Sequence, residues 1–357
     1  MNKSLEEKMK KIGIVFGNEL SFPMELVERI NSKTDKFKAE SLSIDAIKNT
    51  ETTDYSVIFD RISYRVPFYN SFLKLALLNG TRIVNNPFWN CADNNIFQSA
   101  LAAKIGIPTP KTVLLPSKEL PDDTNADTFH NLKYPLNWDE VFSFVKFPAY
   151  LKPNFGHTSA NAYKVYNRKE FFSAYELTGK TPMVVQESIN FDAYYRCFVI
   201  ASKRIMIVKY EPTKPLHMRY EKSSENIEES VVKLLTKICN DVSNLLGFEF
   251  NSIDIGLLNG TAYAIDLVNP TPHADKEYLG ESHFEWLIEN TADYLIEIAS
   301  SHKEAKKDFT FKELIFGESD NSIAAKPAKK ARATKEVAPK TETGDAPKKR
   351  GRPRKES

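Results

Sequence analysis

The chain has little glycine for its size, with 13 glycines among 357 residues, about half the frequency usual in soluble proteins. No expected strand is followed by G-x-G-x-x-G, which excludes a dinucleotide-binding loop of the Rossmann kind. No uninterrupted apolar run is long enough to span a membrane. The amino terminus, MNKSLEEKMKKIGIVFG, lacks the cleavage site of a secretory signal. Composition therefore predicts a globular protein without a membrane partner.

Cysteine is also scarce, and its spacing excludes two classes of site. The three cysteines, Cys91, Cys197 and Cys239, are far apart in the sequence. They form neither a metal-binding spacing nor a disulfide framework. This usage suits a reducing compartment, so we expect a cytoplasmic location. A buried, inert cysteine is a more common outcome than a cysteine nucleophile.

Charge is distributed unevenly along the chain. The net charge is +2, but residues 324–357 carry 12 Lys+Arg against 4 Asp+Glu, which makes the remainder mildly acidic. After about Asp320 the composition changes to lysine, alanine, proline and threonine with no aromatic residue. Such a segment cannot bury a core, so we expect residues 321–357 to be a disordered basic tail with partners of its own.

The first part of the chain alternates buried strand patterns with helical patterns, which is typical of a small parallel α/β domain. The patterns are strands at 11–17, 57–59 and 82–85 and helices at 22–31 and 72–78. The sequence therefore predicts an N-terminal domain over residues 1–83.

The next part, residues 84–320, mixes strands with amphipathic helices around a polar loop. The longest helix is expected over 226–246, where apolar residues keep the helical period up to Gly247. Another is expected to begin at Asp93, a suitable N-cap. The remaining expected elements are strands at 112–115, 149–153, 163–166, 183–187, 196–200 and 204–210 and helices at 138–145, 169–175 and 284–299.

A hairpin is the sharpest local signal. Two apolar-rich runs flank Asn259-Gly260, a pair that readily adopts the positive φ of a tight turn. Asp254 lies on the first run, and Asp266 and Asn269 lie at the end of the second. These side chains either converge as three hard oxygen ligands, which would suit Mg²⁺ with substrate phosphates, or are solvent-facing strand residues followed by an exit turn.

Four segments in order resemble the ATP-grasp superfamily, most closely its carboxylate–amine ligases of the glutamate-ligase and glutathione-synthetase kind. They are an entry segment ending in GIPTPKT, a strand ending in YLKP, a hinge with an arginine strand, and the hairpin. Their positions are 84–116, 147–156, 183–200 and 251–275. The resemblance implies an α/β chain made of an ATP-grasp body with α+β lobes behind a small parallel α/β domain, with ATP and Mg²⁺ as cofactors.

The resemblance also assigns a nucleotide site. Lys152 would neutralise the α- and β-phosphates. Gln186 to Ile189 would present backbone groups to adenine, and Glu187 or Asp192 would accept from a ribose hydroxyl. Glu187 is equally well explained as an ordinary carboxylate at a strand edge.

The metal ligands implied by the resemblance are Asp254, Asp266 and Asn269. Arg196 stands among aromatic and apolar residues, where an unpaired charge is costly. It is therefore either paired with a carboxylate of the body or directed at a phosphate or at the carboxylate being activated. Arg219 is a second candidate for that catalytic role, although a plain loop arginine explains it as well.

Two departures from the family pattern concern phosphate binding. Near the start of the entry helix, where relatives usually have a lysine, the chain reads Asp93-Asn94-Asn95. Asn95 can hydrogen-bond a phosphate but brings no charge. The loop after Lys152, NFGHTSANA, contains one glycine, Gly156, where relatives usually have several.

Two functions follow as expectations. The first is an ATP- and Mg²⁺-dependent ligase that joins a small-molecule carboxylate to an amine through an acyl phosphate. The second is a degenerate ATP-grasp binding module with little or no catalysis, acting through its tail or a protein partner. The intact lysine, arginine and acidic positions favour the ligase, whereas the two departures favour the binding module.

The end of the tail resembles an AT-hook. Residues 347–355 read PKKRGRPRK. Glycine and proline would keep such a segment slim and extended, and arginines suit the narrow minor groove of A·T-rich DNA. The resemblance implies binding of DNA or another polyanion, whereas a charge run more usually serves only solubility. The residues concerned are Arg350, Gly351, Arg352, Pro353 and Arg354.

Overall fold

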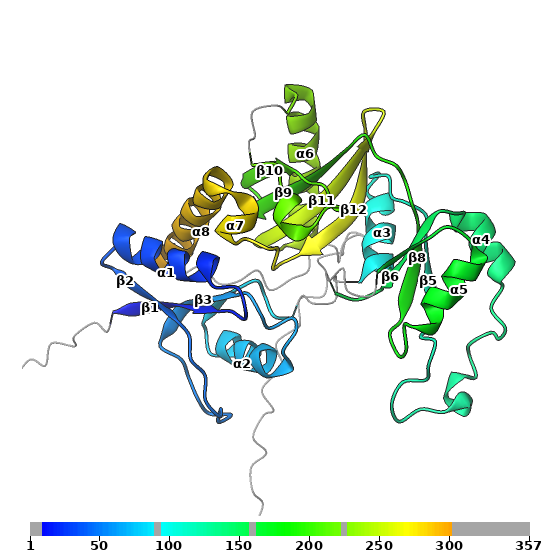
Figure 1. Cartoon of the computed structure of the whole chain (residues 1–357). Helices are drawn as coiled ribbons and strands as arrows, with labels where there is room; N and C mark the ends of the chain where they lie inside the picture. The colour runs from blue at the N-terminus through cyan, green and yellow to red at the C-terminus, as the bar shows by residue number, and fades with distance from the viewer. Residues whose placement is uncertain (1–8, 89–93, 157–161, 223–226, 302–357) are drawn as a thin grey trace, which may run out of the picture.

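The computed structural model describes residues 9–88, 94–156, 162–222 and 227–301. Its strands form three four-stranded sheets, each covered by helices (Figure 1). The fold is the mixed α/β architecture expected from the sequence. The AT-hook-like residues 350–354 and the rest of the tail lie outside the described residues. No helix in the described ranges is long and apolar enough to cross a membrane.

The N-terminal sheet is parallel, with strand order β2-β1-β3-β4. Alternate residues of its strands face opposite sides, so Ile12 and Phe59 contact α1 while Val15 and Ile58 contact α2. This sheet confirms the parallel α/β prediction. The bounds are β1 (Lys10–Val15), α1 (Ser21–Lys33), β2 (Phe37–Ser41), β3 (Tyr55–Asp60), α2 (Pro67–Leu78) and β4 (Arg82–Val84).

Strand β2 was not expected from the sequence. It reads FKAES, and only Phe37 and Ala39 are buried. With only two apolar residues, the alternation of apolar and polar residues is too short to predict an edge strand from the sequence. Its pairing with β1 supplies the register that local sequence does not show.

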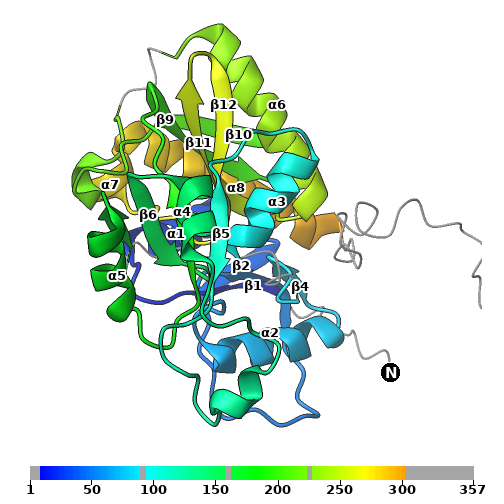
Figure 2. The same cartoon turned by 90° about the vertical axis from the view of Figure 1, so that its right-hand side faces the viewer.

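The middle sheet is antiparallel, with strand order β5-β8-β6-β7. Two helices cover one face through a cluster of aromatic rings that includes Trp138, Phe142 and Phe171. Figures 1 and 2 show this sheet and its helices beside the third sheet. The bounds are β5 (Thr112–Leu115), the 3-10 turn η2 (Ala126–Phe129), α4 (Trp138–Val145), β6 (Ala149–Pro153), β7 (Tyr163–Val165), α5 (Arg168–Glu176) and β8 (Met183–Glu187).

The third sheet is antiparallel with order β10-β9-β11-β12. Helices α3 and α6 pack on one face, and α8 packs on the other. The hairpin turns at Asn259 and Gly260, with φ of +48° and +74° as predicted. The bounds are α3 (Asn95–Lys104), β9 (Ala193–Ile200), β10 (Arg204–Lys209), the 3-10 turn η3 (Leu216–Met218), α6 (Glu229–Leu246), β11 (Phe250–Leu258), β12 (Thr261–Asn269), α7 (Lys276–Leu279) and α8 (Glu281–Ser301).

The N-cap of α3 differs from the expectation. The Asn94 side chain accepts a hydrogen bond from the backbone N–H of Phe97 at 2.7 Å and so caps the helix. Asp93, the expected cap, lies outside the described residues. Asparagine and aspartate are about equally good N-cap residues. The sequence alone therefore does not distinguish Asp93 from Asn94 as the cap of α3.

One hydrophobic core joins the N-terminal sheet to the third sheet. It contains side chains from α1, β1, β3, β9, β11 and α8. Phe250 lies at its centre, with ring centroids 5.1 Å from Phe59 and 6.1 Å from Phe22. The middle sheet has a separate core of its own. The domain boundaries at residues 83 and 320 remain predictions, because this shared core crosses the first of them.

We expect Phe250→Ala to lower the free energy of unfolding by about 3–5 kcal/mol, because it leaves a cavity in the shared core. Leu78→Ala, at an 83% exposed position, is the control and should change it by less than about 0.5 kcal/mol. Urea denaturation followed by circular dichroism measures both. A loss confined to one of two separate transitions would show that the two sheets do not unfold together.

Candidate functional site

Three charged side chains form a row across the third sheet. Asp254 on β11 is the register partner of Arg196 on β9 and of Asp266 on β12. The neighbours Cys197 and Ile253 are buried on the α6 side, so alternation places Arg196 and Asp254 on the opposite face. The register between β11 and β12 shifts on both sides of Asp254. Such bulges often occur beside active sites and redirect a side chain.

Arg196 is the best-held member of this row. Its Nε and Nη2 donate to the two carboxylate oxygens of Asp254 at 2.7 and 2.6 Å, and its Nη1 donates to the Tyr220 hydroxyl at 2.8 Å. The ring of Tyr210 lies 4.1 Å from the guanidinium carbon. Burial opposes the charge, but Asp254 and the tyrosines raise the pKa of Arg196 well above its usual value. Of the two alternatives for Arg196, the structure therefore shows the carboxylate pair.

Lys152 faces this row from the middle sheet. It lies near the end of β6 and is only partly exposed. Burial lowers the pKa of its ammonium, while Asp266 and then Asp254 act to raise it. The structure thus brings Lys152, on the middle sheet, within electrostatic range of the two carboxylates on the third sheet.

The acidic pair offers a suitable donor set for Mg²⁺. Asp254 and Asp266 supply carboxylate oxygens on adjacent strands. Asn269 lies at the end of β12, and its side-chain oxygen accepts from the backbone N–H of Thr271 at 3.3 Å, so its part in a metal site remains a prediction. Mg²⁺ commonly binds one or two carboxylates together with substrate phosphates. Each oxygen of Asp254 accepts one bond from Arg196 and retains a further lone pair. Within the described residues no group of three or more His, Cys, Asp or Glu forms a metal cage, so substrate oxygens would have to complete the coordination.

Asn95 belongs to a clamp that holds the end of β6. Its side-chain amide donates to the carbonyl oxygens of Pro153 and Asn154 at 2.9 and 3.3 Å. The Asn154 side chain accepts from the backbone N–H of Ile96 at 3.1 Å. These bonds tie the start of α3 to the residues directly after Lys152. Sequence reasoning missed Asn154, which is buried in the structure. Its position two residues after Lys152 was the only signal in the sequence.

The residues expected to hold adenine and ribose lie in or after β8. The Gln186 amide donates to the Thr112 hydroxyl at 2.9 Å, and Glu187 accepts from the backbone N–H of Lys111 at 3.3 Å. Asp192 accepts from the backbone N–H of Asn259 at 2.7 Å and so supports the hairpin turn. Ile189 lies half-buried in the link to β9. Their nucleotide roles remain predictions.

Arg219 lies near Arg196 but outside the row. Its Nε donates to the Lys214 carbonyl at 2.8 Å, and its Nη1 lies 3.5 Å from the Tyr210 hydroxyl. Tyr210 therefore touches both arginines. Arg219, Tyr210 and Asp192 line an open cavity of about 450 Å³. The catalytic role of Arg219 also remains a prediction.

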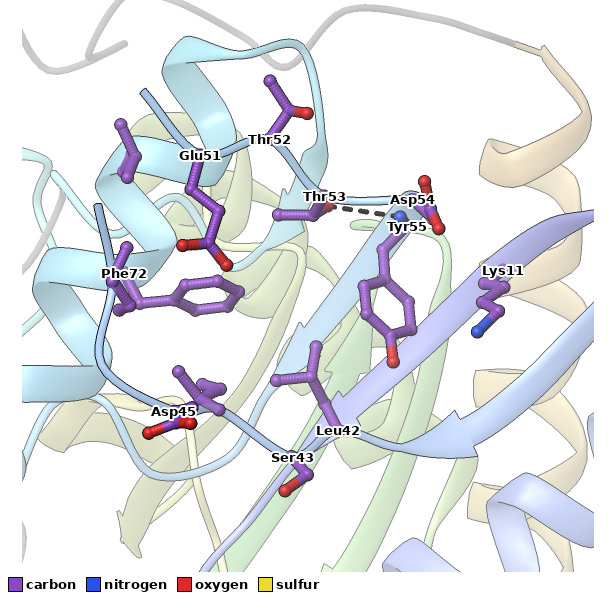
Figure 3. Close-up of a pocket in the computed structure, with 13 residues that line it drawn as sticks. Lys11, Leu42, Ser43, Asp45, Glu51, Thr52, Thr53, Asp54, Tyr55 and Phe72 are labelled. Carbon is purple, nitrogen blue, oxygen red and sulfur yellow. Dashed lines mark hydrogen bonds between the residues drawn. The ribbon is translucent and has the colours of Figure 1, made fainter. Parts of the chain in front are cut away.

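A different pocket lies in the N-terminal sheet (Figure 3). It has a volume of about 250 Å³ and is bounded by residues 42–55 and α2. Figure 3 shows Tyr55 at its centre, with the backbone N–H of Tyr55 bonded to Thr53. The Tyr55 hydroxyl and the Lys11 ammonium both bond Glu40, at 2.8 and 2.9 Å. These groups satisfy one another, so we assign the pocket no part in the site.

Solved structures with a similar fold are ATP-grasp ligases. The ligase PsnB in complex with a minimal precursor has a TM-score of 0.57 at 14% identity, covering 81% of this chain and 99% of that one. D-alanine–D-alanine ligase from Bacillus anthracis in complex with ATP has a TM-score of 0.57 at 16% identity, with coverages of 82% and 99%. A RimK domain ATP-grasp protein from Sphaerobacter thermophilus gives 0.56 at 14% identity, with coverages of 81% and 98%. Protein-family models and curated proteins give no match to the sequence. At these identities, the likeness shows the ATP-grasp fold.

We expect Lys152→Met to stabilise the folded protein at pH 7 by roughly 0.5–2 kcal/mol, a gain common when a functional strain is removed. Burial lowers the pKa of Lys152 below the usual 10.5, so the charged form is disfavoured in the folded state. The stability of the wild type should therefore rise with pH between its folded-state pKa and 10.5, and the advantage of the variant should shrink there.

The free energy of unfolding measured in urea from pH 7 to pH 10.5 tests this expectation. Lys237→Met is the matched control, because Lys237 is exposed on α6, where it pairs with Asp241. The control should stay within about 0.5 kcal/mol of the wild type. A Lys152→Met variant that is less stable at pH 7 would mean that attraction to the carboxylates outweighs burial.

Proposed function

We propose that the protein is an ATP- and Mg²⁺-dependent ligase that joins a carboxylate to an amine. The observation that carries this proposal is the electrostatic interaction of Lys152 with Asp266 and Asp254, which share a register row with Arg196. The solved relatives that share this fold are named as ligases, and one is described in complex with ATP. A cytoplasmic location and small-molecule carboxylate and amine substrates complete the proposal.

Different residues would neutralise different charges in such a reaction. Lys152, partly stripped of water, is suited to neutralise phosphate charge on the middle-sheet side. Asp254, Asp266 and Asn269 would hold Mg²⁺, which would supply charge neutralisation for the transferred phosphoryl group. Arg196, rigidly held by Asp254 and Tyr220, would present positive charge toward the reacting oxygens. Positioning and charge stabilisation supply most of the catalysis in phosphoryl transfer.

The chemical steps balance as two transfers. An oxygen of the acceptor carboxylate attacks the γ-phosphorus of ATP, the bond to the β,γ-bridging oxygen breaks, and ADP leaves. The amine nitrogen then attacks the acyl carbon, inorganic phosphate leaves with the carbon–oxygen bond electrons, and the amine loses a proton to solvent. The products are an amide, ADP and phosphate.

One observation favours the alternative, a binding module with weak or no catalysis. The position where relatives carry a charged lysine is Asn95, and its amide is already bonded to the carbonyls of Pro153 and Asn154. Asn95 therefore contributes to holding β6 and adds no charge for phosphate. Lys152 and Arg196 would have to supply the positive charge on their own.

The replacement Asp266→Asn distinguishes the two functions. It is nearly isosteric but removes one charge from the proposed metal site, so ADP release should fall by at least about 100-fold while the fold is kept. The assay supplies Mg-ATP with mixed amino acids and small carboxylates. Asp241→Asn on α6 is the control and should release ADP at the wild-type rate. A wild type that binds no Mg-ATP at millimolar concentration would refute the ligase.

We also propose that the tail binds DNA or another polyanion through Arg350, Gly351, Arg352, Pro353 and Arg354. Deleting residues 324–357 should abolish retention on A·T-rich duplex DNA, whereas deleting 324–346 alone should preserve it. The affinity of the full chain should fall with salt, with a slope of roughly −0.9 per phosphate neutralised. Unchanged DNA retention after the longer deletion would contradict this assignment. Electrophoretic mobility shift at several salt concentrations measures it.

A further inference from the structure

The N-terminal sheet contains a topological switch point. Strand β1 is central, the chain passes from it to β2 on one side, and β3 lies on its other side. In open parallel sheets the crevice beyond the carboxyl ends of two such strands is the usual place for a ligand. Here those ends are followed by the loops 16–20 and 61–66.

A cavity of about 400 Å³ lies at this crevice. We call it the junction cavity. Gly17, Asn18 and Glu19 line it after β1, and residues 61, 62 and 64–66 line it after β3. The segment that follows β12, from Thr271 to Asp275, together with Tyr278, forms the remaining wall. The cavity therefore lies between the N-terminal sheet and the strand that ends in the proposed metal ligand Asn269.

A buried ion pair builds the wall of the junction cavity. Arg61 is almost fully buried and pairs through Nε and Nη2 with both oxygens of Glu19. Its Nη2 also donates to the Pro272 carbonyl at 2.8 Å, and Glu19 accepts from the backbone N–H of Ala274 at 3.1 Å. The charges of Arg61 and Glu19 therefore cancel while they hold the post-β12 segment in place.

Arg65 differs from Arg61 because its charge is not balanced. It is exposed at the cavity, its guanidinium carbon lies 5.1 Å from the Tyr64 ring, and no carboxylate pairs with it in the described part of the chain. The other carboxylate of the cavity, Asp275, accepts from the backbone N–H and the hydroxyl of Ser21 at the start of α1. An uncompensated guanidinium beside a cavity is suited to a carboxylate or a phosphate.

His273 connects the junction cavity to the charged row. Burial is the first cause that lowers the pKa of its imidazole, and the positive charges of Arg196, Arg61 and Arg65 lower it further, with Asp275 opposing them. The Tyr220 hydroxyl, which accepts from Arg196, lies 3.5 Å from the His273 carbonyl oxygen. A ligand in the cavity would thus lie one side-chain layer from Arg196 and would meet a neutral imidazole at pH 7.

We propose that the junction cavity anchors the acceptor through a second anionic group, held by Arg65, while the acceptor carboxylate to be activated reaches the charged row. This inference rests on the proposed ligase function and narrows its substrate class to acids that carry two anionic groups. The anchoring group is a carboxylate or a phosphate, because a guanidinium recognises both through the same charge-assisted hydrogen bonds. Arg65 is the specificity-determining residue.

The test uses matched pairs of small acids on the full chain. N-acetylglutamate is compared with N-acetylglutamine, and N-acetyl-O-phosphoserine with N-acetylserine, by isothermal titration calorimetry. At least one acid with two anionic groups should bind about tenfold or more tightly than its partner with one, and Arg65→Gln should remove that preference. The pair that shows the preference identifies carboxylate or phosphate as the anchor.

Three variants separate the site from a general effect of charge. Arg65→Lys should recover part of the preference, because it restores charge without the fork of donors. Arg168→Gln, an exposed arginine on α5 paired with Asp139, should keep the full preference. Circular dichroism confirms that each variant is folded, which is expected because Arg65 is exposed. Equal binding of the acids with two anionic groups and those with one, or a preference that survives Arg65→Gln, overturns the proposal.

ADP release, measured with the same acids after Mg-ATP and mixed amino acids are added, separates this inference from the ligase proposal. A preference for two anionic groups that depends on Arg65 but brings no ADP release supports the junction cavity and refutes the ligase. ADP release with no preference for acids with two anionic groups supports the ligase and refutes the anchoring role. Both results together support an acceptor that is held at the cavity and activated at the row.

Discussion

The pair between Arg196 and Asp254 is the interaction on which the candidate site depends. Two bonds fix the planes of both groups, and Tyr220 takes a third donor. Burying two such charges is costly unless their geometry is good and further bonds satisfy them. The pair therefore adds little to the stability of the fold, and its main effect is to orient the two charged groups. It holds a guanidinium and a carboxylate at fixed places beside Asp266, where Lys152 can face them.

The elements around this pair explain its rigidity. Arg196 and Asp254 lie on the two central strands of the third sheet. Helix α6 packs behind them, and the core shared with the N-terminal sheet lies in front of the same strands. Residues on such strands keep their positions better than residues on loops. Lys152 has a comparable support, because Asn95 and Asn154 hold the end of its strand against α3.

Much of this arrangement was predictable from local signals. The Asn259-Gly260 turn gave the hairpin, and the hairpin placed Asp254 and Asp266 side by side. Local sequence does not contain the contacts made across long separations. Examples are the bond from Asp192 to the Asn259 turn and the clamp between Asn95 and β6. Both side chains were assigned to nucleotide binding, and both have protein partners that only tertiary pairing reveals. The junction cavity escaped notice because three separate loops build it.

The separation of the cores has a consequence for proton balance. The N-terminal and third sheets share one core, whereas the middle sheet has its own, so Lys152 and the carboxylates that act on it are held by different cores. Any change in the packing between the middle and third sheets that exposed the ammonium to water would remove the burial that lowers its pKa and would favour its charged form. The charge of this one side chain therefore depends on the packing between two separately stabilised parts of the chain.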